Sequence, residues 1–158
     1  KRYIKNKRTI YCSSTILLNE NRTKEIGIFK SKTNALWRGM HISHCSICMP
    51  RRFHEIYGYY PEVKNAMDYA LIAKILKNEG KEIFKIIPGI HSYFTLGGYS
   101  DKNYFAGLNA TKKINMDLGM NYFIAIFIEL CYILKYRVKA KLKQWVWICK
   151  KILSLFLR

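Results

Sequence analysis

Asp68 is the carboxylate whose setting in the sequence best suits chemistry, because it stands where a helical pattern begins. Four apolar residues that follow it recur at the spacing of one helix face: Leu71, Ile72, Ile75 and Leu76. With Gly80 as a stop signal, the pattern predicts a helix over residues 67–79 that carries Asp68 in its first turn. A carboxylate in general can act as a proton acceptor, and at this position it can also simply stabilise the helix N-terminus. The residues alone leave both roles open.

A second group of chemistry-bearing residues comprises His41, His44, Cys45 and Cys48, which are the residue types that bind zinc. We predict that residues 41–49 form a strand, in which Cys45 and Cys48 would face opposite sides of the sheet. The sequence contains no second ligand pair of matching spacing. The cysteines are therefore interpreted as small buried hydrophobic residues, and no metal site is predicted within this chain.

The elements that must position these residues are mainly strands. β-Branched and aromatic residues dominate residues 9–18, and residues 19–21 supply turn chemistry, so residues 25–29 are expected to pair back as a hairpin. Residues 53–57 are expected to form a short helical turn closed by Gly58. Further strands are predicted at residues 41–49, 83–87 and 91–96.

Length and composition limit the class of protein. A chain of 158 residues can bury one real core, and its 50% apolar residues exclude a disordered tail. Lys and Arg total 28 against 10 Asp and Glu, a formal charge of +18, which indicates an anionic partner. The five cysteines are odd in number and irregularly spaced, so a reducing cytoplasm is expected rather than a disulfide framework.

The character of the sequence changes from Asn121 onward. Apolar blocks at residues 121–134 and 145–158 flank a basic segment at residues 136–144, and neither block reaches the roughly 20 residues that a membrane-spanning helix needs. Lysines interleaved with tryptophans instead predict amphipathic helices that lie in a membrane interface. A helix packed on the domain, or a coiled-coil partner, is the alternative.

Five segments follow one another along the chain: TIYCSSTILLNEN, RGMHISHCSICMPRR, EIYGYYPEVKNAMDYALIAKILKNEG, HSYFTLGGYS and the basic amphipathic C-terminus. In this order they resemble the family 2 glycosyltransferases, particularly the bacterial enzymes that build surface polysaccharides. The resemblance covers residues 9–115. The sequence departs from the family pattern at three positions near the predicted helix start: Met67, Ala70 and Lys74.

The resemblance implies an α/β fold of the GT-A type, a Rossmann-like mixed sheet flanked by helices and followed here by amphipathic C-terminal helices. In that family the first half of the domain binds a nucleotide diphosphate through an Asp-X-Asp motif and a divalent metal, Mg or Mn. No Asp-X-Asp occurs in this sequence. We therefore expect residues 1–118 to be the acceptor-side half of the domain, with the donor-binding half absent, and residues 119–158 to be a basic helical tail.

The resemblance also implies roles for individual residues. Asp68 corresponds to the general base that activates the acceptor hydroxyl, with Tyr69 beside it as a substrate-binding residue. His44 is expected on a strand facing the reaction centre, in contact with the donor diphosphate or the metal region; a structural, hydrogen-bonded histidine is the alternative. Three residues of the loop that follows the last predicted strand are expected to line the substrate site: Gly97, Gly98 and Ser100.

The expected function is inverting transfer of a sugar from a nucleotide-diphosphate sugar to a glycan or lipid-linked acceptor. The expected place is the cytoplasm, peripheral on the inner face of the cell membrane, with an anionic membrane surface as partner. The alternative is a non-enzymatic basic module that binds anionic lipid or nucleic acid, although no nucleic-acid-binding motif is present and nucleic acid is not expected as a partner.

Overall fold

The computed structural model describes residues 8–156, with the side chains of residues 100, 143 and 147–156 outside the description. The chain divides into two compact units, Lys1–Met120 and Asn121–Arg158, and each is described by itself. The first unit is mixed α/β, with a four-stranded mixed sheet and helices.

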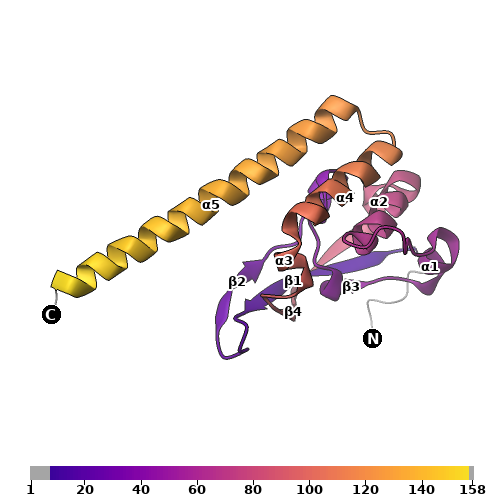
Figure 1. The fold of residues 1–158 in the computed structure, drawn as a ribbon. Helices are drawn as coiled ribbons and strands as arrows, with labels where there is room; N and C mark the ends of the chain where they lie inside the picture. Colours follow the sequence, from indigo (N-terminus) through magenta and orange to yellow (C-terminus); the bar gives the residue numbers. More distant parts are fainter. Residues whose placement is uncertain (1–7, 157–158) are drawn as a thin grey trace. The chain divides into compact units, whose positions relative to one another are not determined.

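Strand β1 (Ile10–Leu18) is the centre of the sheet (Figure 1). It pairs antiparallel with β2 (Glu25–Phe29) and β3 (Ile47–Cys48), and parallel with β4 (Phe84–Thr95). The predicted hairpin is confirmed. Its turn is held by the Asn19 side chain, whose Oδ1 accepts hydrogen bonds from the backbone N–H groups of Thr23 and Lys24 at 2.8 and 3.0 Å.

Strand β4 merges two strands that the sequence predicts separately. Its register with β1 shifts between Cys12 and Ser14, so the residues around Pro88 and Gly89 bulge from the ladder. Proline has no N–H to donate to a ladder, and Gly89 adopts a φ of +73°, which favours glycine. The interruption that separated the two predicted strands is therefore real, but it is a bulge within one strand.

The predicted strand at residues 41–49 is largely wrong. Only Ile47–Cys48 pair with β1, and His44–Ser46 form the 3₁₀ turn η3. The Ser46 hydroxyl donates to the carbonyls of Ser13 at 2.7 Å and Ser43 at 2.8 Å. Such hydroxyl-to-backbone bonds compete with a ladder and favour a turn.

The remaining elements of the first unit are helical: η2 (Thr33–Arg38), α1 (Arg51–Tyr57), α2 (Met67–Glu79), η4 (Lys81–Ile83), α3 (Tyr99–Lys102) and α4 (Tyr104–Asp117). The predicted helix over residues 67–79 is confirmed, and Gly80 ends it with a φ of +82°. Helices α2 and α4 lie on the same side of the sheet (Figure 1). The buried face of α2 joins Ile10 and Phe53 in the main core, where each fully buried apolar side chain contributes about 1.5–3 kcal/mol.

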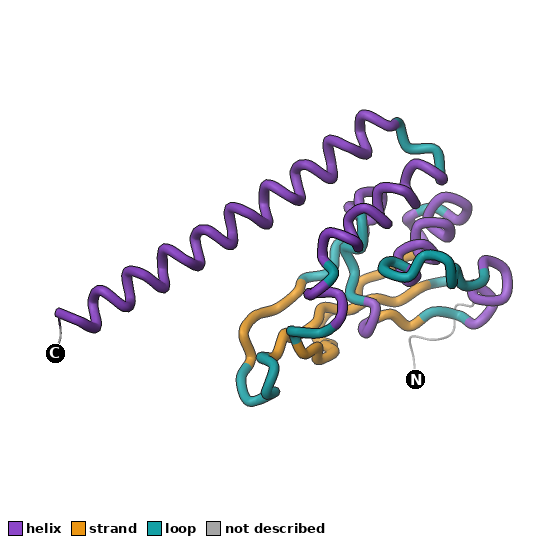
Figure 2. Tube along the Cα trace, in the orientation of Figure 1, coloured by secondary structure: helices purple, strands orange, loops and turns teal. Residues whose placement is uncertain are grey.

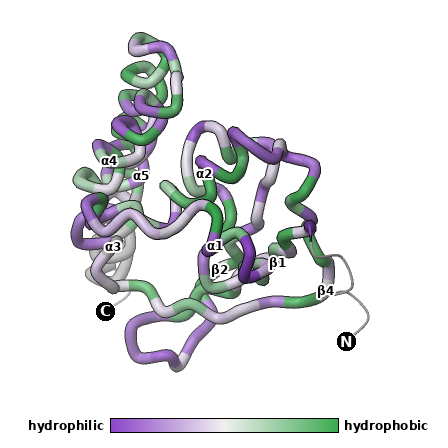
Figure 3. Tube along the Cα trace, turned by 90° about the vertical axis from the view of Figure 1, so that its right-hand side faces the viewer, coloured by the Kyte–Doolittle hydropathy of each residue, from purple (hydrophilic) through white to green (hydrophobic). Residues whose placement is uncertain are grey.

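The second unit is one helix, α5 (Tyr122–Phe156), of 35 residues. Separate helices were expected here, but this segment contains no Gly or Pro that would break the helical hydrogen bonds. Figure 3 shows hydrophobic and hydrophilic residues interleaved along it. Within the described residues, no helix combines the length and the apolar composition needed to cross a membrane.

Candidate functional site

A pocket of about 260 Å³ contains Asp68 and His44 together, although 24 positions of the sequence separate them. Asp68 comes from the first turn of α2 and His44 from the 3₁₀ turn η3. Apolar side chains complete the pocket on the side of the core: Ile47, Met49, Leu71 and Ile72. The arrangement places a carboxylate and imidazole groups around a small space with an apolar wall.

The Asp68 carboxylate is exposed and makes no hydrogen bond or ion pair within the described part of the chain. Ala66 is the N-cap of α2, and no side chain caps this helix end. Asp68 therefore does not act as a hydrogen-bonding cap, although its charge still favours the helix dipole. Its oxygens are free to accept a proton or a hydrogen bond from a ligand.

The His44 ring packs edge-on against Phe94 of β4, with 5.7 Å between the ring centroids and an angle of 85°. This contact fixes one side of the ring, while the residue stays exposed at the pocket. His44 was expected on a strand, and it lies instead on a turn. The turn and the Phe94 contact, rather than strand alternation, direct it toward the pocket that Asp68 shares.

Two further residues of this pocket, His54 and Tyr59, were not found from the sequence. Their rings are stacked, with 5.0 Å between centroids and an angle of 26°. His54 Nδ1 is buried and has no hydrogen-bond partner in the described residues, whereas Tyr59 is 66% exposed. The missed signal is Gly58, whose φ of +67° ends α1 and turns the chain so that Tyr59 folds back onto His54.

Tyr69, predicted as a substrate-binding residue, does not line this pocket. Its side chain is 2% exposed, and its hydroxyl lies 3.1 Å from the Leu36 carbonyl and 2.6 Å from Asn115 Oδ1. These contacts tie α2 to η2 and α4. Because successive helix residues point about 100° apart, Tyr69 faces the core while Asp68 faces out.

The predicted loop residues are not brought to the Asp68 pocket either. Gly97 has a φ of +88°, and its N–H donates to Asp101 Oδ2 at 2.7 Å, so it forms the turn between β4 and α3. Gly98 is the N-cap residue of α3. Ser100 lies in α3, and its side chain is outside the described residues.

The described residues offer no ligand set that fits the divalent metal implied by the resemblance. Among the residues that the structure describes, no three His, Cys, Asp or Glu side chains are grouped to hold a metal ion. The carboxylate and imidazoles of the pocket can act as proton-accepting and hydrogen-bonding groups.

Comparison of this chain with protein-family models, with curated proteins and with solved structures gives no match.

Proposed function

We propose that this chain carries the acceptor side of an inverting glycosyltransferase, with Asp68 as the general base. The observation that carries the proposal is the unpaired Asp68 carboxylate at the rim of a pocket that also holds His44 and His54. The resemblance of residues 9–115 to family 2 glycosyltransferases supports the same role. The observed arrangement is mixed α/β, and we propose that it is part of a GT-A fold.

The proposed reaction needs one proton acceptor on this side of the site. As the acceptor hydroxyl oxygen bonds to the anomeric carbon, its proton passes to an Asp68 oxygen. The bond from that carbon to the nucleotide diphosphate breaks, and the diphosphate leaves with the electron pair. A single displacement inverts the configuration at the anomeric carbon.

The other pocket residues would bind and orient the acceptor, a glycan or a lipid-linked glycan. The imidazoles of His44 and His54 can donate to or accept from sugar hydroxyls. The apolar wall excludes water from one side of the reacting hydroxyl. The nucleotide-diphosphate sugar, with Mg or Mn, would be bound by a donor-binding part that these residues do not supply.

The test is the substitution Asp68→Asn in this chain, assayed together with the part that binds the donor. The amide has the shape of the carboxylate but cannot accept the proton, so turnover should fall roughly 100-fold or more while donor affinity changes little. Glu55→Gln is the matched control, because Glu55 is an exposed carboxylate outside the pocket. Near-normal turnover of Asp68→Asn, measured by release of nucleoside diphosphate, would overturn the proposal.

A second proposed function is contact with an anionic membrane surface through α5. One face of this helix exposes an apolar stripe: Phe123, Phe127, Leu130, Leu134, Val138 and Trp145. Spacings of three, four and seven residues place these side chains on one side of a straight helix. Glu129 is the only acidic residue in the sequence of this helix. Exposed cations lie among and beside the apolar residues: Lys135, Arg137, Lys139 and Lys141.

A bilayer suits this surface better than a nucleic acid does, because the stripe requires an apolar phase as well as negative charge. The stripe can enter the headgroup boundary while each flanking cation contributes on the order of 1 kcal/mol near anionic lipid. Such contact would place the protein at the periphery of the cell membrane, on its cytoplasmic face. This contact does not depend on glycosyl transfer.

Liposome flotation of the full chain tests this function. Binding to anionic vesicles should fall with salt and should be largely lost in the variant Lys139→Glu, Lys141→Glu, Lys143→Glu. The matched control changes three cations of the first unit, Lys24, Lys30 and Lys81, to Glu. Equal binding to neutral vesicles at every salt concentration would contradict the electrostatic part, and equal loss in both triple variants would contradict the assignment to α5.

A further inference from the structure

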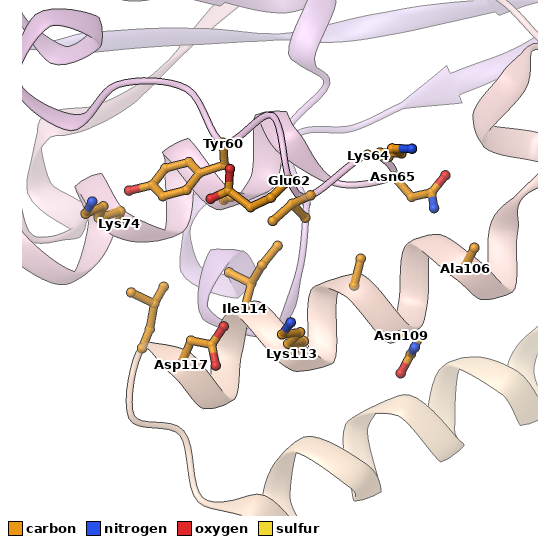
Figure 4. Close-up of a pocket in the computed structure, with 14 residues that line it drawn as sticks. Tyr60, Glu62, Lys64, Asn65, Lys74, Ala106, Asn109, Lys113, Ile114 and Asp117 are labelled. Atoms are coloured by element: carbon orange, nitrogen blue, oxygen red, sulfur yellow. The ribbon is translucent and has the colours of Figure 1, made fainter.

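A larger pocket of about 680 Å³ is lined by α4 and by the segment that joins α1 to α2, which is a loop in Figure 2. Figure 4 shows Tyr60 and Glu62 of this loop facing Lys113 and Asp117 of α4 across the space. Small side chains, including Ala106 and Ala110, leave room along the α4 side. The volume is that of a typical small-molecule site.

The loop wall of this pocket is ordered by its own backbone. Val63 N–H donates to the Tyr60 carbonyl at 3.1 Å, which closes a turn with Pro61 at its second position. Ala66 N–H then donates to the Val63 carbonyl at 3.3 Å. At the far end, the Asn65 carbonyl lies 3.7 Å from the position of a Cβ added to Gly107, so the loop and α4 approach closely. The wall is therefore built before any ligand arrives.

Two residues of this wall carry buried polar atoms without partners. Tyr60 Oη and Asn65 Oδ1 are buried, and neither has a hydrogen-bond partner among the described residues. An unsatisfied buried polar group typically costs about 1–3 kcal/mol. A ligand that supplies hydrogen-bond donors, reached by a small movement of these side chains, would recover that cost.

The charged side chains of this pocket are also unpaired. Lys64, Lys74 and Lys113 form no ion pair in the described part of the chain, and neither do Glu62 and Asp117. Lys74 is held in place by the Tyr60 ring, with Nζ 4.8 Å from the ring centroid. The pocket thus offers donor-only ammonium groups together with acceptor-only carboxylates.

We propose that this pocket binds a phosphorylated polyol of the sugar-phosphate class. From the α4 wall, Lys113 can supply a charge-assisted hydrogen bond to a phosphate, while Lys64 and Lys74 add positive charge at the two ends of the pocket (Figure 4). The carboxylates and the Asn65 amide oxygen require donors, which hydroxyl groups supply and a bare anion does not. The inference is independent of the transfer reaction assigned to Asp68, which lines the other pocket.

Calorimetric titration of the full chain with glucose 1-phosphate, ribose 5-phosphate, inorganic phosphate and glucose tests the proposal. Saturable binding of a sugar phosphate is expected, on the order of tenfold tighter than phosphate or glucose alone. Lys113→Glu should weaken it by a similar factor or more, and Ala110→Trp should block it by filling the pocket. Lys81→Glu is the matched control, because it makes the same charge change at an exposed position outside the pocket.

Phosphate binding as tight as sugar-phosphate binding would reduce the pocket to a plain anion site and overturn the proposal. So would the absence of saturable binding by either sugar phosphate, or equal weakening by Lys113→Glu and Lys81→Glu. Thermal melting of each variant shows whether it is folded, so that Lys113→Glu decides the matter even if Ala110→Trp does not fold.

Discussion

Helices α2 and α5 use apolar residues in opposite ways. In α2, Leu71, Ile72 and Ile75 are all nearly or fully buried, and they pack into the core formed with the sheet. In α5, Phe127 and Leu134 are 67% and 65% exposed. Both sequences are amphipathic, but only α2 buries its apolar face in the core of its own unit.

The difference separates residues that hold the fold from residues that remain available for contact. Burial in α2 explains why the first turn of the helix, with Asp68, has a fixed place beside η3. Exposure in α5 leaves apolar area whose burial would be worth roughly 25 cal/mol per Å² in another environment. The two helices should therefore respond differently to the same substitution.

Ile75→Ala should give the largest effect on stability. Ile75 is 0% exposed in the main core, and removing its larger side chain leaves a cavity that costs about 2–5 kcal/mol. Urea unfolding followed by fluorescence measures the free energy of unfolding of the chain. A loss below about 1 kcal/mol would show that α2 is not packed as described.

Cys12 should make the stability of the first unit fall at alkaline pH. Burial raises the pKa of its thiol from 9.0 to about 12. Below pH 9 the thiol is protonated in both states, but above it the unfolded chain ionises first, so the free energy of unfolding falls by up to about 1.4 kcal/mol per pH unit until about pH 12.

The measurement compares unfolding free energies at pH 8 and pH 10 in variants that differ only in the thiol. Cys12→Val removes the titrating group and should lose about 1 kcal/mol less over this range than the parent chain. Cys131→Ser, at an exposed position of α5, should keep the parent slope. Identical slopes in all three proteins would contradict the assignment to Cys12.

The sequence predicted best those elements whose signals are local. The period of the apolar residues predicted the helix over residues 67–79, and Gly80 marked its end because its positive φ of +82° favours glycine. The hairpin of β1 and β2 was predictable for the same reason, since Asn19 closes its turn within five residues. The Pro88–Gly89 interruption was visible, but its outcome as a bulge depended on pairing with β1.

Positions set by distant contacts were not predictable from local pattern. A turn forms around His44 in place of the expected strand, because the Ser46 hydroxyl donates a hydrogen bond to the Ser13 carbonyl in β1. The meeting of His44 with Asp68 was anticipated only through the family resemblance, and His54 with Tyr59 was missed because their stacking follows from the backbone turn at Gly58. Tyr69 was placed beside Asp68 by sequence adjacency, but the helix turn directs it into the core.

Leu134→Ala should have the smallest effect on stability. Leu134 is exposed on the apolar stripe of α5, and substitution at such a position changes the free energy of unfolding by about 0.5 kcal/mol or less. Alanine is also a better helix former than leucine, so the helix itself is not weakened. The same urea unfolding assay used for Ile75→Ala measures this effect directly. If the stripe serves an external surface, vesicle binding should drop in this variant while folding is unchanged. A loss of stability comparable to that of Ile75→Ala would instead mean that Leu134 is a core residue, and the contrast between the two helices would not hold.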